Sequence, residues 1–259
     1  MLNLPSEVVK AITVTGIWDT QLWFQPAGEL SFRCRFIVAQ TLGQGCAFYA
    51  NDVDARTLSQ LVGTPLLHIG QFQNVAIQAA ILDSIFASGS LVRPAEHVEV
   101  MDGSPDQKAG WRSSIVTNEA QKLLQRSANI GRIALVGASF LLEGKLRSLG
   151  CRVDVFDLDP VIVGSELPTG AIVQHGDDLL HAQASYDVAV MTGMTLTTGT
   201  LELLSKRFKD SGATVLIYAQ TGANIASFYG HWGVDTAVCE PIPFYNFQGQ
   251  SRIAVHRFS

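Results

Sequence analysis

The second half of the chain repeats one pattern, in which a short apolar, β-rich segment is followed by a turn and then by a helix-like segment. The segments with strand character are 132–136, 152–156, 188–191, 214–218 and 252–256. Strands that alternate with helices pair in parallel through right-handed crossovers. The sequence therefore predicts an open, mostly parallel α/β sheet.

The residues that follow these strands are the first candidates for a binding site, because ligands of such sheets bind beyond the carboxyl ends of the strands. Four strand ends contribute small or polar residues: Gly137 and Ser139, Asp157, Thr192 and Gly193, and Gln220 and Thr221. Parallel strands end at the same edge of a sheet. We therefore expect the four groups to converge on that edge.

The loop of residues 192–200, with the sequence TGMTLTTGT, holds five threonines and two glycines. The leucines after it are spaced for a helix that begins near Gly199. The free N–H groups and the positive dipole end of a helix N-terminus attract an anion or a polar ligand. One threonine is enough for a cap, so the further hydroxyls favour a ligand site. The loop residues assigned to it are Thr192, Gly193, Thr195, Thr197, Thr198, Gly199 and Thr200; the alternative is that the threonines only cap the turn.

Asp157 and Ser139 bear on the kind of ligand. An acidic residue at the end of the second strand binds ribose hydroxyls in dinucleotide-binding sheets, although Asp157 could equally hold the neighbouring turn. Segment 137–144, GASFLLEG, lacks the GxGxxG pattern because Ser139 replaces the close-approach glycine. This departure disfavours a pyrophosphate, so S-adenosylmethionine would fit the loop better than NAD.

The first part of the chain predicts a smaller α+β unit. Segments 11–18, 33–40 and 46–50 have strand character, with turn residues between the first two. A short helix follows, which Asp52 or Asp54 would cap.

A longer apolar helix is predicted over residues 72–87. We expect Asp83 within it to lie on an exposed face; the alternative is a polar group turned toward a site. Glycine, proline, aspartate and serine then punctuate 88–112. This change of composition predicts a boundary between a domain of residues 1–110 and a domain of residues 111–259.

Two segments flank the predicted sheet. A helix over 118–127, with Asn118 as its N-cap, should lead into the first strand. The aromatic and proline-rich tail, residues 240–247, is interpreted either as a lid over the site or as an interface with a second copy. We expect a homodimer.

Three groups of side chains have metal-ligand chemistry but no recognised spacing. They are His97 with Glu96, Glu99 and Asp102, His175 with Asp177 and Asp178, and His231 with Cys239. Acidic loops and helix caps are the more common reading of such groups, so we expect no metal held directly by side chains.

Composition limits the function classes. The chain has 259 residues, 47% of them hydrophobic, and a net charge of −5, which argues against nucleic acid or an anionic membrane as partner. We find no signal peptide and no apolar run of membrane-spanning length. Four scattered cysteines without CxxC spacing indicate reduced thiols and a cytoplasmic protein.

The order of four segments resembles the heavy-metal-chelation family, namely LVGASFLLEGKL (135–146), VFDLDP (155–160), YDVAVMTGMTLTTGTLELL (186–204) and FYGHWGVDTA (228–237). This resemblance implies a Rossmann-like domain that follows a smaller, enolase-N-terminal-like domain. The TGxTLxxGT loop is its most specific element. The family has glycine-proline-serine after the fourth strand, whereas this chain has Ala219-Gln220-Thr221-Gly222, so its ligand is expected to differ.

Two functions follow from these observations. The first is the binding or processing of a small metal-chelating or amino-acid-like molecule in the interdomain cleft, in metallophore or heavy-metal metabolism. The second is an S-adenosylmethionine- or nucleotide-dependent enzyme, such as a small-molecule transferase. No catalytic constellation is recognisable. From the two functions, the cofactor is expected to be either S-adenosylmethionine or a metal chelate.

Overall fold

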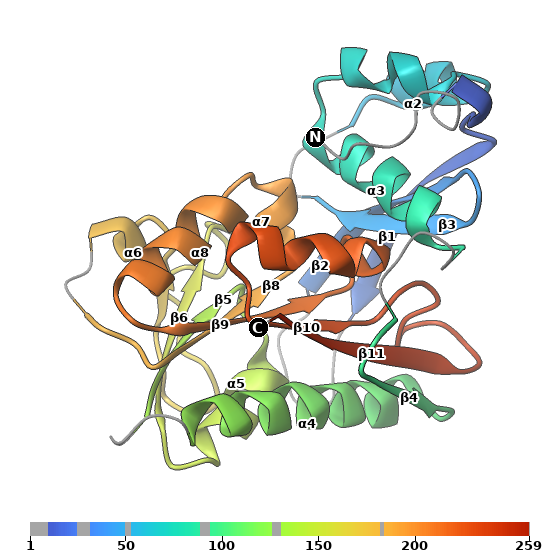
Figure 1. Ribbon diagram of the computed structural model, residues 1–259. Helices are drawn as coiled ribbons and strands as arrows, with labels where there is room; N and C mark the ends of the chain where they lie inside the picture. Colours follow the sequence, from blue (N-terminus) through green and yellow to red (C-terminus); the bar gives the residue numbers. More distant parts are fainter. Residues whose placement is uncertain are drawn as a thin grey trace.

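The computed structural model describes residues 10–24, 32–49, 53–88, 94–125, 131–181 and 184–258. It contains a three-stranded antiparallel sheet and an eight-stranded, mostly parallel sheet (Figure 1). The described residues up to 88 form the first lobe, and those from 94 form the sheet lobe. The predicted fold class, a Rossmann-like α/β domain after a smaller α+β domain, is confirmed.

The first lobe is a meander of three strands covered by helices. Strand β1 (Gly16–Phe24) pairs with β2 (Phe32–Gln40), and β2 pairs with β3 (Gln44–Phe48). The strand predicted over 11–18 begins later than expected, and Thr13 forms only an isolated bridge with Pro65. The helices are α2 (Ala55–Leu61), η1 (Leu66–Gln71) and α3 (Val75–Phe86). As predicted, Asp54 caps α2 by accepting a hydrogen bond from the Arg56 N–H at 3.2 Å.

Helix α3 packs closely on β3. A Cβ atom on Gly45 would lie 2.0 Å from the Ser84 nitrogen, so only glycine lets the strand approach the helix this closely. The expectation that Asp83 lies on an exposed face is wrong, because its exposed fraction is 0%. The helix is covered on a second side by the sheet lobe, and Asp83 points into that contact.

The large sheet has the strand order β4-β11-β10-β9-β8-β5-β6-β7. Its parallel strands are β5 (Arg132–Val136), β6 (Arg152–Asp157), β7 (Val173–His175), β8 (Val188–Thr192), β9 (Thr214–Ala219) and β10 (Thr236–Cys239). Strand β11 (Ser251–Arg257) is antiparallel to β10, and β4 (His97–Met101) is antiparallel to β11. The five predicted strands are present; β4, β7 and β10 are additional.

Helices cover both faces of this sheet (Figure 1). Helices α4 (Pro105–Leu124) and α5 (Phe140–Arg147) lie on one face. The other face carries α6 (Asp178–His181), α8 (Leu201–Asp210) and η2 (Ala223–Trp232). Alternate residues of the central strands point to the two sides: Ile133 and Leu135 pack with α4 and α5, whereas Ala134 and Val136 belong to the core shared with α8.

Helix α4 begins well before the predicted Asn118, which is an exposed residue within it. Ser104 is the N-cap, and it forms a capping box with Gln107 in which the Gln107 N–H donates to Ser104 Oγ at 3.3 Å and Gln107 Oε1 accepts from the Ser104 N–H at 2.9 Å. The predicted domain boundary between residues 110 and 111 falls inside this helix. In the part of the chain that the structure describes, no helix is long and apolar enough to cross a bilayer.

Candidate functional site

The strand order reverses between β5 and β8. Strand β5 pairs with β6 on one side and with β8 on the other. The chain leaves β5 toward α5 on one face and leaves β8 toward α8 on the opposite face (Figure 1). Ligands of open α/β sheets bind where the connections diverge in this way, so the carboxyl edge of the β5/β8 pair is the first place to examine.

Gly137 and Thr192 meet at this point. Gly137 has a φ of +92°, and a Cβ atom on it would lie 2.2 Å from Thr192 Oγ1. Both the backbone conformation and the space therefore require glycine. Thr192 Oγ1 is buried and has no hydrogen-bond partner among the described residues. An unpaired hydroxyl thus lies at the reversal of the strand order.

Asp157 and Ser139 flank this point. The Asp157 carboxylate accepts hydrogen bonds from the Ala138 N–H at 2.7 Å and from the Asp159 N–H at 2.9 Å. Both of its oxygens therefore hold turns, which agrees with the alternative interpretation that Asp157 stabilises the neighbouring turn. Ser139 is the residue before α5, and its side chain makes no capping hydrogen bond. Its hydroxyl is half-buried beside the loop that follows β5.

The threonine loop is itself helical, because residues Met194–Thr197 form the short helix α7. Thr195 Oγ1 donates to the Thr192 carbonyl at 2.8 Å, and Thr197 Oγ1 donates to the Met194 carbonyl at 2.9 Å. Thr198 Oγ1 lies 2.9 Å from Thr200 Oγ1, and neither side chain caps α8. Several hydroxyl groups of the loop therefore form hydrogen bonds with the loop's own backbone. Thr198 and Gly199 are exposed.

The loop after β9 touches the first lobe. Thr221 Oγ1 accepts a hydrogen bond from the Phe48 N–H at 2.9 Å, and the Gly222 N–H donates to the Cys46 carbonyl at 3.1 Å. A Cβ atom on Gly193 would lie 2.8 Å from the Thr221 carbonyl oxygen. The predicted convergence of the four strand-end groups on one edge is confirmed, and Thr221 is also a contact between the lobes.

Asp83 is the second link between the lobes. Its Oδ1 accepts a hydrogen bond from the Asn224 N–H at 2.6 Å, and its Oδ2 accepts from the Cys46 N–H at 2.9 Å and from Asn224 Nδ2 at 3.1 Å. Burial raises the pKa of Asp83 to about 7, and these N–H donors counteract part of that rise. The carboxyl group fixes η2 against α3 and β3.

A buried polar cluster lies beyond β9 and β10. The Arg112 guanidinium lies over the rings of Tyr245 at 4.2 Å and Tyr218 at 4.9 Å. Glu240 is fully buried and accepts hydrogen bonds from Gln220 Nε2 at 2.8 Å and from the Tyr245 N–H at 2.9 Å. Burial raises the pKa of Glu240, and Arg112 opposes that rise. The side chain of Gln220, a predicted site residue, is therefore hydrogen-bonded within this cluster.

Sequence reasoning missed Arg112 and Glu240. Glu240 directly follows β10, which is not among the predicted strands, and Arg112 lies in the segment 88–112 that is predicted as a boundary. The available signal was the position of Glu240 before Pro241, a strand end like those of the other candidate residues. The tail after it packs its Phe244 and Tyr245 with Phe36 of β2 in one buried cluster.

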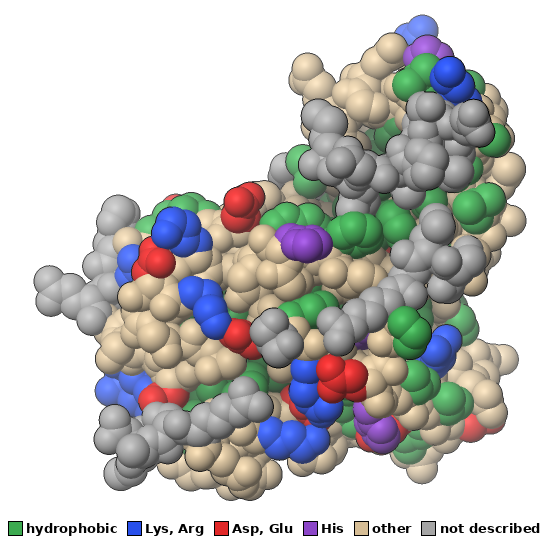
Figure 2. Space-filling view, in the orientation of Figure 1, with side chains coloured by type: hydrophobic (Ala, Val, Ile, Leu, Met, Phe, Trp, Pro, Cys, Tyr) green, Lys and Arg blue, Asp and Glu red, His purple; other side chains and the backbone are tan. Residues whose placement is uncertain are grey.

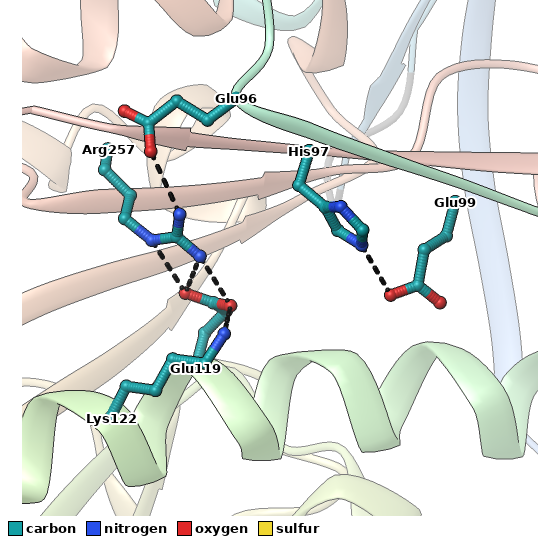
Figure 3. A network of polar contacts seen from close by, with 6 residues as sticks. All are labelled: Glu96, His97, Glu99, Glu119, Lys122 and Arg257. Atoms are coloured by element: carbon teal, nitrogen blue, oxygen red, sulfur yellow. Dashed lines mark hydrogen bonds and ion pairs between the residues drawn. The ribbon is translucent and has the colours of Figure 1, made fainter.

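Two of the three groups with metal-ligand chemistry contain a close pair of side chains. His97 Nε2 lies 2.9 Å from Glu99 Oε1, and His175 Nδ1 lies 3.6 Å from Asp177 Oδ2. Figure 3 shows His97 with Glu99, and Glu96 separately with Arg257 in an ion-pair network that also holds Glu119 and Lys122. Among the described residues, no three such side chains lie close enough together to hold a metal ion.

Two hollows in the surface lie away from the strand-end groups. One of about 440 Å³ is lined by Arg147, Arg152, Val153, Asp154, Ala171, Ile172 and Gln174. The other, of about 660 Å³, includes Tyr186, Leu203, Lys206 and Phe208 in its lining. Both are open to solvent, and three of the seven lining residues of the first, Arg147, Arg152 and Asp154, are ion-paired. On the face seen in Figure 2, basic and acidic side chains are interspersed over the sheet lobe.

Three comparisons with known proteins bear on this site. Residues 119–222 match the model of the DUF364 family, which is described as "putative heavy-metal chelation". The matched region runs from α4 through β5, β6 and β8 to the loop after β9, and so contains all the predicted site residues. Among curated proteins, none matches the chain.

Two solved structures share the fold over nearly the whole length. A DUF364 protein of unknown function from Desulfitobacterium hafniense is 14% identical with a TM-score of 0.62, and the match covers 95% of this chain and 93% of that one. A DUF364 protein from Pyrococcus horikoshii is 13% identical with a TM-score of 0.54, over 97% and 95% of the two chains. The resemblance to the heavy-metal-chelation family that the sequence predicts is confirmed: its family model matches residues 119–222, and the chain has the fold of its solved members.

Proposed function

We propose that this chain binds a small metal-chelating or amino-acid-like molecule beyond the carboxyl ends of β5 and β8, beside the first lobe. Thr192 carries the proposal. A buried hydroxyl without a hydrogen bond costs about 1–3 kcal/mol, and Thr192 Oγ1 is such a group at the reversal of the strand order. Valine would fill the same volume without that cost, so the fold itself gains nothing from the hydroxyl. A ligand that accepts or donates a hydrogen bond there gives the hydroxyl a role.

The surroundings suit a polar ligand with a carboxylate. Ser139 offers a hydroxyl that does not cap α5, and the exposed Thr198 lies in the turn that leads into α8. Backbone N–H groups at the start of a helix favour negative charge. The family description of heavy-metal chelation supports a ligand that chelates a metal, in metallophore or heavy-metal metabolism.

The second candidate is an S-adenosylmethionine- or nucleotide-dependent enzyme. The sharp turn at Gly137 and the acidic Asp157 at the end of β6 favour it, because these are the positions that hold a nucleoside in Rossmann-like sheets. Against it, both Asp157 oxygens already accept backbone N–H donors. We therefore rank this candidate second.

A thermal-shift screen separates the candidates, since a ligand that binds only the folded state raises the melting temperature. The probes are S-adenosylmethionine, NAD, free divalent metals, and metal-loaded aminocarboxylate chelators. We expect the loaded chelators to raise the melting temperature. A shift with S-adenosylmethionine or NAD alone would transfer the assignment to the second candidate.

Thr192→Val then tests the site with any probe that binds. We expect affinity to fall about tenfold or more, which is the loss of one buried hydrogen bond of ~1.4 kcal/mol, while the stability of the unliganded protein stays equal or rises. Thr214→Val is the matched control, because Thr214 is the first residue of β9 and lies at the other end of the strand from the proposed site. Unchanged affinity of Thr192→Val for the responding probe would place the ligand elsewhere.

A further inference from the structure

Strand β4 is the outer strand of the large sheet (Figure 1). Its five residues pair with β11, and no other described segment pairs with them. An outer strand presents a row of backbone N–H and C=O groups that can pair with another chain.

The opposite edge of the same sheet is protected by the chain itself. The Val173 N–H of β7 donates to the Ser165 carbonyl at 3.0 Å, and the Gly164 N–H donates to the Val173 carbonyl at 2.8 Å. The bridge between Glu166 and Ile172 extends this cover. One edge of the sheet is therefore closed by a folded-back segment.

Strand β4 lacks two of the common protections of an edge strand. Its sequence, HVEVM, contains no proline and no lysine, the two residue types that most often block pairing at an edge. Val98 is 40% exposed and Val100 is 55% exposed. An edge with two exposed valines and without proline or lysine is suited to strand addition.

We propose that β4 pairs with the β4 of a second copy of this chain in antiparallel fashion, which joins the two large sheets into one. Two identical strands that pair in this way are related by a twofold axis perpendicular to the sheet. Such an axis keeps each side chain on its own face, and only residues on the same face oppose each other. One residue must therefore oppose its own copy at the centre.

Charge pairing favours Val98 as that centre, because centring on Val100 would bring no unlike groups together. With Val98 opposite Val98 of the partner subunit, His97 opposes Glu99 of the partner subunit, and the same pair recurs by symmetry. Centring on Glu99 would oppose two carboxylates, and centring on His97 would oppose two imidazoles. Directly opposed unlike groups stabilise a strand pair and like charges destabilise it.

Both of these side chains are available for such a contact. His97 and Glu99 have side chains that are 55% and 40% exposed, and Figure 3 shows them on the side of β4 that faces α4. Trp111 Nε1 donates to Glu99 Oε2 at 3.0 Å and holds the carboxylate in place. Within one chain His97 pairs with its own Glu99. In the dimer His97 would also meet the partner's Glu99, and Glu99 would also meet the partner's His97.

Sedimentation velocity tests this pairing. A five-residue strand buries less than the ~1,000 Å² of a strong interface, so we expect a monomer–dimer equilibrium that shifts with protein concentration. Val98→Arg and Val98→Asp each oppose two like charges at the centre, and both variants should be monomeric at concentrations where the wild type is dimeric. Val161→Arg, at an 84% exposed position remote from β4, is the control and should keep the dimer.

Mixing the two variants gives the decisive result. Arginine opposite aspartate replaces repulsion with attraction, so an equimolar mixture of Val98→Arg and Val98→Asp should dimerise although neither does so alone. Unchanged melting temperatures would show that the variants are folded. A wild type that stays monomeric, a dimer that both substitutions leave intact, or a mixture that does not associate would each overturn the proposal.

Discussion

The Asn224 N–H donates to Asp83 Oδ1 at 2.6 Å, and this hydrogen bond joins η2 of the sheet lobe to α3 of the first lobe. Cys46 of β3 donates to the other oxygen of the same carboxyl group. Asp83 is thus bonded at once to η2 of the sheet lobe and to β3 of its own lobe. A carboxyl group in this position makes the junction sensitive to protonation.

The first prediction concerns the pH dependence of stability. Burial raises the pKa of Asp83 to about 7, above the value near 4 of an unfolded chain. Between these values the folded state binds more protons than the unfolded state, so the free energy of unfolding falls as pH rises. The fall attributable to Asp83 is at most about 4 kcal/mol between pH 4 and 7, and it levels off above pH 8.

Urea unfolding of the wild type and of Asp83→Asn at a series of pH values measures this contribution. We expect the stability difference between them to change across this window in favour of the variant as pH rises. Asp210→Asn is the control, since Asp210 is an exposed residue that pairs with Lys206 on the surface. A difference that is constant from pH 4 to 8 would show that Asp83 titrates as an ordinary aspartate.

The second prediction concerns the turn after β5. Gly137→Ala places a methyl group 2.2 Å from Thr192 Oγ1 in a left-handed backbone conformation, and we expect a loss of about 2–4 kcal/mol of stability. Gly150→Ala is the matched control, because Gly150 has a φ of +78° with open space around it, so its loss should be only ~1 kcal/mol.

Adding Thr192→Ala removes the hydroxyl and the methyl group that clash with the new side chain. The double variant should recover part of the stability lost by Gly137→Ala, and the coupling free energy from chemical denaturation measures the contact. Additive effects would mean that the two residues do not touch.

The third prediction concerns the buried cluster. Arg112→Met leaves the Glu240 carboxylate buried without its cation, and we expect a loss of about 3–5 kcal/mol. Glu240→Gln in the same chain removes the unpaired charge and should restore a substantial part of that loss. Arg252→Met, at an exposed position, should change the free energy of unfolding by less than ~0.5 kcal/mol. If Glu240→Gln gives no recovery, the two groups are not electrostatically coupled.

The fourth prediction concerns the contact between β3 and the loop after β9. Thr221→Val removes the acceptor of the Phe48 N–H, and a buried donor left without a partner costs about 1–3 kcal/mol. Hydrogen exchange should show faster exchange of the Phe48 amide in this variant, with little change at amides in β5. Equal protection of the Phe48 amide in both proteins would mean that the lobes are held by other contacts.

The central strands and the convergence of their ends could be predicted from the sequence. Val188 to Met191, for example, is an apolar run between polar residues, and such runs are typical of strands buried on both faces. Strand β4 was missed for the opposite reason: its His97 and Glu99 are polar and its valines are exposed, so the segment looks like a loop.

The errors at Asp83 and α4 have different physical causes. Asp83 lies on a helix that is covered from two directions, and a sequence gives no sign of the second cover when it comes from another lobe. The start of α4 was visible as Ser104 with Gln107 three residues on, but Pro105 and Gly110 resemble linker residues. Proline is favourable in the first turn of a helix, and packing against the sheet compensates for the glycine.

Strand β11 lies between β10 and β4, so residues 97–101 have no place in the sheet until residues 251–257 have been synthesised. On the ribosome, β4 cannot pair until the whole stretch between it and β11 has emerged, and closure over so long a stretch is slow. Truncation after Gln250 would remove β11 and leave β4 with no neighbour to join, although the residues around the β5/β8 pair would remain.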